Sequence, residues 1–233
     1  MNRILIVEDD LQVCEILQFY LMQTKQYDVT VVHSAESALC IVQNGRYDAI
    51  LLDVMLPGED GIAFCEKIRK KIYCPIIFIS CLNDDETIVR ALNMGGDDYI
   101  VKPFRGPVLL AHLEANLRRS AKTEIHEGDE VLTVGELTLD PATHRVMKRG
   151  EELVLSPTEY ELLFYMMRER GHFLDFDQVY TEVWQRPSLG DLKTLFVHVR
   201  NLRKKIEDDP TQPRYITTYR RKGYIFAEDL DIP

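Results

Sequence analysis

Short apolar runs alternate with amphipathic stretches over the first 119 residues of this 233-residue chain. The apolar runs lie at 3–7, 28–32, 49–53, 75–80 and 99–101. Helical patterns follow them at about 11–22, 34–44, 62–70, 84–94 and 107–119. Such alternation is typical of right-handed βαβ crossovers, which build a parallel sheet covered by helices on both faces. Residues 1–119 therefore predict a doubly wound α/β domain with a five-stranded parallel sheet.

The pattern changes after a polar stretch, 120–130, which we expect to be a short linker. Short strand patterns come next, at 131–139 and 145–155. Ser156, Pro157 and Glu159 then form a capping-box sequence, which predicts the start of a helix. Helices are expected at about 158–170, 177–184 and 191–206, and a hairpin at about 214–226. This order predicts a winged helix-turn-helix domain of the α+β class over residues 131–228.

Two of the apolar runs end in acidic side chains. Glu8, Asp9 and Asp10 follow the first run, and Asp53 closes the third. Because ligands of such folds bind at the carboxyl ends of the strands, we expect these carboxylates to share one pocket. Like charges at close range raise each other's pKa, and a hard divalent cation with oxygen ligands relieves the repulsion. The sequence therefore predicts a Mg²⁺ site at Glu8, Asp9 and Asp53, although acidic strand ends are also common in solvated loops.

Two further strand ends carry Ser80 and Lys102. Lys102 precedes Pro103, which favours an extended backbone at Lys102 and invites a cis peptide bond. With the acidic pocket, these residues predict a site that accepts a phosphoryl group. Asp53 is the nucleophile, Mg²⁺ neutralises the anionic donor and product, and Lys102 and the Ser80 hydroxyl bind phosphoryl oxygens. Singly, Asp9 could be a helix cap, Lys102 a surface cation and Ser80 a strand-end polar group, but their joint order favours the phosphoryl site.

The net charge of −10 is unevenly distributed along the chain. Residues 193–222 contain nine Lys or Arg against three acidic side chains. A local basic face matters more to a polyanion than the total charge does, so the second domain remains a candidate for nucleic-acid binding.

The composition also favours a soluble, unsecreted protein in the cytoplasm. No run approaches the roughly 18 apolar residues of a membrane-spanning helix, and no basic-then-apolar leader opens the chain. The five cysteines are odd in number and lack metal-ligand spacing. We expect them to be reduced thiols.

Specific sequence motifs occur in both halves. Those of the first half are Ile-Val-Glu-Asp-Asp (6–10), Leu-Asp-Val-Met-Leu-Pro-Gly (52–58) and Gly-Asp-Asp-Tyr-Ile-Val-Lys-Pro-Phe (96–104). Those of the second half are Leu-Ser-Pro-Thr-Glu-Tyr-Glu-Leu-Leu (155–163) and Val-His-Val-Arg-Asn-Leu-Arg-Lys-Lys-Ile (197–206). The first set resembles the flavodoxin-like receiver domain of bacterial response regulators, and the second resembles their OmpR/PhoB subfamily. The resemblance spans essentially the whole chain.

This resemblance implies a function for the whole chain. A sensor histidine kinase would transfer a phosphoryl group to Asp53, and Tyr99 would act as an aromatic switch that turns inward with Ser80. The activated receiver would form a homodimer and bind promoter DNA to regulate transcription, with RNA polymerase as a further candidate partner. The resemblance implies Mg²⁺ as the cofactor and no membrane partner.

The expected dimer surface departs from the family pattern. Receivers of this subfamily usually dimerise through their fourth and fifth helices and the strand between them, using ion pairs across the interface. Ile88 and Val108 replace one such pair, Asp97 and His112 stand where the family pairs Asp with Arg, and Asp98 and Arg119 match a third pair. We hypothesise that an apolar contact replaces an ionic one, because exposed ion pairs contribute only roughly 0–1 kcal/mol. The alternative is a drifted surface that dimerises weakly.

The second domain is expected to read DNA with helix 191–206 and the following hairpin. The expected contacts are Lys193, Thr194, Val197, Arg200, Asn201, Arg203 and Lys204 in the helix and Thr218, Arg220 and Arg221 in the wing. Asn201 stands where the family often has Arg, and Asn pairs with adenine whereas Arg favours guanine. Arg221 stands where family wings usually have Gly, which adds charge and removes backbone freedom.

Two alternatives remain at this stage. A Mg²⁺-dependent phosphatase would need a second Asp two residues after the nucleophile, and position 55 is Met, so we do not expect an enzyme. The other alternative is a constitutive DNA-binding regulator whose receiver dimerises without phosphorylation. The complete set of Asp53, Ser80 and Lys102 argues against it, and the altered dimer surface keeps it open.

Overall fold

The computed structural model describes residues 1–121, 130–188 and 192–230. The chain divides into two compact units, Met1–Ser120 and Ala121–Pro233, called here the N-terminal and C-terminal units. The linker predicted at 120–130 lies almost entirely outside the described residues, so the exact domain boundaries stay predictions. No helix in the described part of the chain is both long enough and apolar enough to cross a bilayer.

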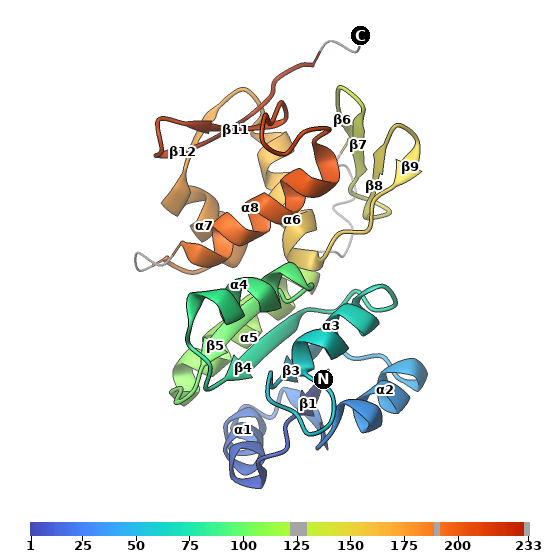
Figure 1. Ribbon diagram of the computed structural model, residues 1–233, viewed down its shortest axis with the longest axis vertical. Helices are drawn as coiled ribbons and strands as arrows, with labels where there is room; N and C mark the ends of the chain where they lie inside the picture. Colours follow the sequence, from blue (N-terminus) through green and yellow to red (C-terminus); the bar gives the residue numbers. More distant parts are fainter. Residues whose placement is uncertain (122–129, 189–191, 231–233) are drawn as a thin grey trace. The chain divides into compact units, whose positions relative to one another are not determined.

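The N-terminal unit is a five-stranded parallel sheet with helices on both faces, which confirms the predicted doubly wound fold (Figure 1). The strands lie in the order β2-β1-β3-β4-β5. They are β1 Asn2–Val7, β2 Tyr27–Val32, β3 Ala49–Leu52, β4 Ile76–Ser80 and β5 Asp98–Val101. The helices are α1 Leu11–Gln23, α2 Ala35–Asn44, α3 Gly61–Arg69, α4 Asp85–Asn93 and α5 Gly106–Ala121.

Both faces of this sheet are buried. Ile4 and Ile6 of β1 belong to one apolar cluster, together with Leu17 of α1 and Leu113 of α5. The opposite face belongs to a second cluster that takes in α2, α3 and α4, with Phe64 as its largest helical side chain. Strands covered on both sides read as continuous apolar runs, which is why the sequence pattern identified them. Parallel strands end at one edge of the sheet, and the polar residues that follow them therefore gather there.

The C-terminal unit combines an antiparallel sheet with three helices and a terminal hairpin (Figure 1). The first sheet has the order β6-β7-β8-β9, formed by Leu132–Val134, Leu137–Asp140, Arg145–Lys148 and Glu151–Glu152. The helices are α6 Pro157–Arg168, α7 Phe176–Trp184 and α8 Lys193–Ile206. The last sheet has the order β10-β12-β11, formed by β10 Phe173–Asp175, β11 Ile216–Tyr219 and β12 Gly223–Phe226. The predicted winged helix-turn-helix domain is therefore confirmed.

The strands predicted at 131–139 and 145–155 are wrong in detail, because each is a hairpin of two shorter strands. Gly135 lies between β6 and β7 with φ +54°, and Arg149 and Gly150 lie between β8 and β9 with φ +54° and +81°. Left-handed backbone of this kind reverses the chain within a tight turn.

The predicted capping box is present at the start of α6. The Ser156 hydroxyl accepts from the Glu159 N–H at 3.3 Å, and Glu159 Oε2 accepts from the Ser156 N–H at 2.8 Å. Lys205 of α8 donates from Nζ to the same Oε2 at 2.5 Å. Glu159 is buried, so this second hydrogen bond holds a charge that burial would otherwise disfavour. One carboxylate thereby joins the beginning of α6 to the end of α8.

Candidate phosphoacceptor and DNA-binding sites

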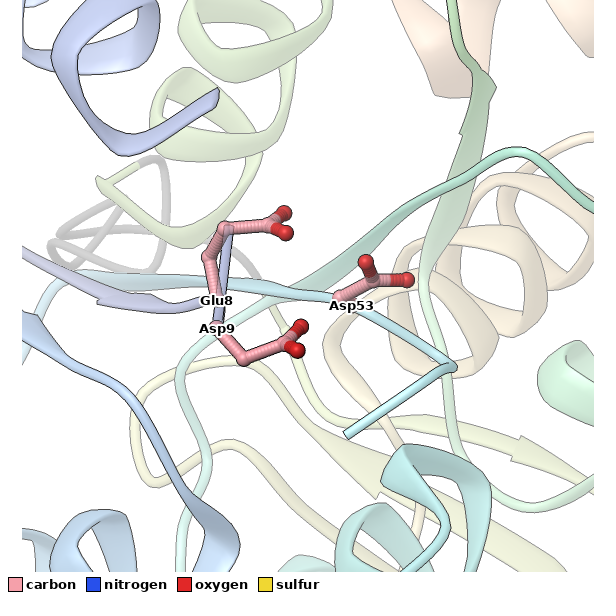
Figure 2. A group of neighbouring side chains, drawn as sticks. All are labelled: Glu8, Asp9 and Asp53. Atoms are coloured by element: carbon pink, nitrogen blue, oxygen red, sulfur yellow. The ribbon is translucent and has the colours of Figure 1, made fainter. Parts of the chain in front are cut away.

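The acidic residues predicted from the strand ends do meet in one pocket. Val7 and Leu52 pair in neighbouring parallel strands, so Glu8 and Asp53 emerge side by side at the same edge. Figure 2 shows the carboxylates of Glu8, Asp9 and Asp53 around one shared space. Each offers a ligand oxygen, and these oxygens lie within 4.8 Å of one another. Glu8 and Asp53 are buried, whereas Asp9 is exposed.

Lys102 lies between the two buried carboxylates. Its Nζ donates to Glu8 Oε2 at 2.7 Å and to Asp53 Oδ2 at 2.6 Å. The Lys102–Pro103 peptide is cis, as the sequence predicts. Burial raises the pKa of Glu8 to about 7, the hydrogen bond from Lys102 opposes that rise, and the charge of Asp53 adds to it. The pocket therefore holds more carboxylate than its single ammonium group neutralises.

The other oxygen of Asp53 is held by the main chain. Asp53 Oδ1 accepts from the Met55 N–H at 3.0 Å, so the carboxylate is fixed at both oxygens. Gly61 starts α3 directly against this loop, because a Cβ there would lie 1.9 Å from the Asp53 carbonyl oxygen. Any side chain at position 61 would therefore displace Asp53 from its hydrogen-bond partners.

Ser80 and Tyr99 occupy the neighbouring strands β4 and β5. Ser80 is fully buried at the end of β4. The Tyr99 ring stacks on Phe78 with centroids 6.2 Å apart, and its hydroxyl donates to the Leu82 carbonyl at 2.7 Å. Burial raises the pKa of Tyr99 to about 12, so the hydroxyl keeps its proton and remains a donor at neutral pH. The two predicted switch residues are thus brought to one end of the sheet.

The donor set fits a magnesium ion. Glu8, Asp9 and Asp53 supply hard carboxylate oxygens, and a cation would stabilise the charged form of Glu8, which burial and the nearby charge of Asp53 disfavour. The exposed position of Asp9 leaves one side of the group open to solvent, as an ion that keeps several water ligands requires.

On the expected dimer surface, Ile88 of α4 and Val108 of α5 are both partly exposed. The pairing of Asp97 with His112, expected across a dimer interface, stays a prediction, and within one chain the two residues have other partners. Asp97 is fully buried, where its Oδ2 accepts from Arg69 Nη2 at 2.6 Å and from the Ile76 N–H at 3.0 Å. Arg69 also binds two carbonyl groups, those of Cys74 and Gly95. Asp97 is therefore committed to its own unit.

His112 is instead a partner of Asp98 within the same chain. His112 Nδ1 lies 2.9 Å from Asp98 Oδ2, and the Asn116 amide donates to the same oxygen at 3.1 Å. Asp98 and Arg119 are both buried, and a pair between Asp98 and Arg119 across an interface stays a prediction. Within the chain, His112 therefore contacts the first residue of β5 and not Asp97, which precedes that strand.

Helix α8, which is expected to be the recognition helix, has its basic residues at its surface. Lys193, Arg200 and Lys204 are exposed, and Thr194 is partly exposed. Helical spacing puts Val197 and Asn201 on the same side, although both are 7 % exposed, so their contacts with bases stay predictions.

The wing hairpin ends in a turn with an unusual backbone. Arg220 and Arg221 have φ +49° and +56°, and the Lys222 N–H donates to the Tyr219 carbonyl at 3.0 Å. Two successive residues with positive φ form the turn that β-hairpins prefer, usually with Asn or Gly there. Arg220 and Arg221 are exposed, as is Thr218. The predicted loss of backbone freedom at Arg221 therefore extends to Arg220.

The contacts of several residues in these sites could not be predicted from the local sequence pattern. Arg69 binds Asp97 across 28 residues, Glu207 binds the start of the wing, and the Met55 N–H binds the nucleophile. Arg203 donates to the Ile216 carbonyl within the chain, and its expected contact with DNA stays a prediction. Partners of this kind depend on which loops meet in space, and no spacing rule along the sequence identifies them.

Two protein families match the chain. The model of the response regulator receiver domain matches residues 4–114, and that of the transcriptional regulatory protein, C terminal, matches residues 150–226. A mutant of RitR is 29 % identical, with 98 % of this chain and 100 % of that one covered and a TM-score of 0.79. DrrB of Thermotoga maritima, described as an OmpR/PhoB homolog, is 28 % identical with 97 % and 99 % covered and a TM-score of 0.52. A two-component response regulator from Clostridium difficile is 36 % identical, with 52 % and 98 % covered and a TM-score of 0.50.

Fold and site together define a phosphoacceptor receiver domain joined to a winged-helix DNA-binding domain. The chain belongs to the two-component response regulators of the OmpR/PhoB type, and it is a DNA-binding regulator of transcription.

Proposed function

We propose that a sensor histidine kinase phosphorylates Asp53 and that the modified receiver dimerises and binds paired half-sites in promoter DNA. The observation that carries this proposal is the buried Asp53 carboxylate, held by Lys102 and the Met55 N–H beside two further carboxylates. A cytoplasmic location agrees with such a partner and such a target.

In the proposed transfer, an Asp53 carboxylate oxygen attacks the phosphorus of a phosphohistidine. The new O–P bond forms as the N–P bond breaks, and the electron pair leaves with the imidazole nitrogen. A magnesium ion at Glu8, Asp9 and Asp53 supplies charge neutralisation for the phosphoryl group. Lys102 holds Asp53 before transfer and offers its ammonium to a phosphoryl oxygen afterwards, and the Ser80 hydroxyl is the second donor.

Activation would be passed on through β4 and β5. A phosphoryl group that draws in the Ser80 hydroxyl changes the space beside Tyr99, whose hydroxyl is bonded to the loop at Leu82. That loop leads into α4, so the two orientations of Tyr99 would bias the surface of α4 and α5 between two states.

We propose that this surface forms the dimer with Ile88 and Val108 as an apolar contact. Asp97 is bound to Arg69 and Asp98 to His112 within one chain, so fewer ionic partners are available across an interface than the family pattern offers. An aliphatic contact would not weaken with salt, unlike an exposed ion pair.

On DNA, α8 would enter the major groove and the wing would reach the backbone or the minor groove. Arg200 and Lys204 would bind phosphates, and Asn201 would favour adenine. RNA polymerase is a further proposed partner. The chain is not expected to turn over a substrate, because Met55 stands where a phosphatase of this chemistry needs a second Asp.

Light scattering tests the proposal directly. The solution mass is measured with and without beryllofluoride and Mg²⁺, which mimic the phosphoryl group. We expect a shift from monomer to dimer, and Asp53→Asn, which cannot bind the mimic productively, should stay a monomer. Ile88→Lys should abolish the dimer while leaving beryllofluoride binding intact. A dimer in the absence of the mimic, unchanged in Asp53→Asn, would favour a constitutive regulator instead.

A further inference from the structure

The wing strand β11 lies at the edge of its sheet. Among the residues that the structure describes, the order β10-β12-β11 gives β11 a strand partner on one side only, through pairs such as Ile216 with Phe226. The backbone groups on the outer side of an edge strand need other partners when they are buried, and Tyr215 and Ile216 are buried. These partners come from Arg203 of α8 and from Glu207, the residue that directly follows α8.

Glu207 follows the last residue of α8 and receives the N–H groups at the start of the wing. Its carboxylate accepts from Arg214 N–H at 2.8 Å, from Tyr215 N–H at 3.0 Å and from Ile216 N–H at 2.9 Å. Glu207 is 6 % exposed, so these charge-assisted bonds are made largely out of contact with water.

Arg203, one helical turn earlier, binds the opposite kind of group on the same strand. Nε and Nη2 donate to the Ile216 carbonyl at 3.0 and 2.6 Å, and Nη2 also donates to the Thr218 hydroxyl at 3.0 Å. The guanidinium carbon lies over the Tyr224 ring of β12, 5.6 Å from the ring centroid. Glu207 thus accepts a hydrogen bond from the Ile216 N–H, and Arg203 donates one to the Ile216 carbonyl. Together they replace the hydrogen bonds that a neighbouring strand would make.

We propose that Arg203 and Glu207 form a clamp that fixes the wing relative to the recognition helix, and that Arg203 acts in DNA binding as a positioning residue. This inference rests on the proposed use of α8 and the wing as DNA contacts. The donor groups Nε and Nη2 are engaged by Ile216 and Thr218, which leaves the exposed cations Arg200 and Lys204 to face the duplex. The clamp sets the separation between the major-groove helix and the cations of the wing tip.

A clamp predicts that the wing and the helix cooperate in binding. If β11 is held against α8, the wing does not lose conformational entropy when one of its cations binds a phosphate, because the position of the wing is fixed before binding. If the clamp is cut, the wing moves, and the same cation contributes less. The contribution of a wing cation should therefore depend on Arg203 and on Glu207, whereas that of a helix cation should not.

A double-mutant cycle measures this dependence. Lys222→Ala removes a wing cation at a position whose φ is not positive, and Arg200→Ala removes a helix cation as the matched control. Each is combined with Arg203→Met, which keeps an apolar stem over Tyr224 but loses the donors. The full-length protein is activated with beryllofluoride and titrated, at several salt concentrations, with a duplex that it selects from a random-sequence pool.

In the wild type, Lys222→Ala should reduce the slope of log affinity against log salt by about 0.9, the value for one phosphate contact. In the Arg203→Met background the same change should leave the slope nearly unaltered, while Arg200→Ala lowers affinity equally in both backgrounds. Equal effects of Lys222→Ala in both backgrounds would overturn the clamp. If neither Lys222→Ala nor Arg200→Ala weakens wild-type binding, the proposed DNA contacts fail and the clamp's role fails with them.

Glu207→Gln separates a clamp from a direct phosphate contact. It removes a negative charge near the DNA, so simple electrostatics predicts tighter binding, whereas a cut clamp predicts the same loss of coupling as Arg203→Met. Arg203→Lys, which keeps one charged donor, should restore part of the coupling. Fluorescence of Trp184, the chain's one tryptophan, reports whether each variant keeps the folded C-terminal unit. An intact unit with unchanged coupling in Glu207→Gln would count against the clamp.

Discussion

The phosphoacceptor pocket and the wing tip both contain side chains of like charge, but these charges are buried and paired in the pocket and exposed to water at the wing tip. In the pocket, Glu8 and Asp53 are buried, and Lys102 bonds to both of them. At the wing tip, Arg220 and Arg221 are exposed to water and stand on a backbone with positive φ. The pocket stores electrostatic repulsion, whereas the wing stores backbone strain. Under the proposed function, the pocket would bind a small cation with a phosphoryl group and the wing tip would bind a polyanion.

The largest expected effect comes from removing the internal cation of the pocket. Lys102→Met should lower the free energy of unfolding of the N-terminal unit by about 3 kcal/mol in EDTA, because two buried carboxylates lose their partner. Asp53→Asn is the matched control and should cost far less, since it removes one of the like charges. Urea unfolding followed by circular dichroism measures both. An unchanged midpoint for Lys102→Met would show that the pocket stores no repulsion.

Relieving the strain of the wing should have a smaller effect and opposite consequences for folding and binding. Arg221→Gly should stabilise the C-terminal unit by about 1 kcal/mol, because glycine adopts positive φ without the penalty that other residues carry. It should also lower the salt slope of DNA binding by about 0.9. Thermal unfolding and salt titrations give the two values.

Lys222→Ala is the control for that experiment, because it removes a charge at the same tip without relieving positive φ. It should flatten the salt dependence and leave stability nearly unchanged. If Arg221→Gly and Lys222→Ala shift stability alike, the strain argument is wrong; if Arg221→Gly leaves the salt slope unchanged, Arg221 is no DNA contact.

The smallest expected effect concerns His144, whose charged form is disfavoured in the folded C-terminal unit. Burial lowers the pKa of His144, whose ring lies 5.2 Å from that of Tyr160, and Asp140 opposes the shift. The unfolded chain therefore binds a proton more readily, so this contribution to stability is complete above about pH 6.5 and is lost as the pH falls below it. Melting followed by Trp184 fluorescence should show this decline. His144→Asn, which tolerates the left-handed backbone at φ +54°, should reduce it.

The fold and the pocket could be predicted from the sequence for one reason: parallel strands buried on both faces give long apolar runs that end at one edge. Glu8, Asp53, Ser80 and Lys102 follow such runs, so their meeting is a consequence of topology. The capping box at Ser156 could also be predicted from the sequence, because its two hydrogen bonds join residues only three positions apart.

Side-chain partners between distant elements could not be predicted in the same way. The family pattern predicts a pair of His112 with Asp97 across a dimer interface, but it does not predict that His112 contacts Asp98 within one chain. Arg203 reads as a basic residue on a DNA-binding helix, and its bonds to Ile216 depend on how β11 returns to that helix. The two hairpins at Gly135 and Gly150 were read as single strands, because a short turn hardly interrupts an apolar pattern.

The shared carboxylate of Glu159 has a consequence for the cooperativity of the C-terminal unit. Its two partners lie at opposite ends of the helical part of the unit. Ser156 caps α6, 3 residues before Glu159, and Lys205 lies near the end of α8, 46 residues after it. Fraying at the end of α8 would leave a buried carboxylate with one partner fewer, and fraying at the start of α6 would remove one of the two hydrogen-bond acceptors of Lys205 Nζ. Opening either helix end therefore makes opening the other easier. Partial unfolding that frees the recognition helix alone is disfavoured, and the helices tend to open as one unit.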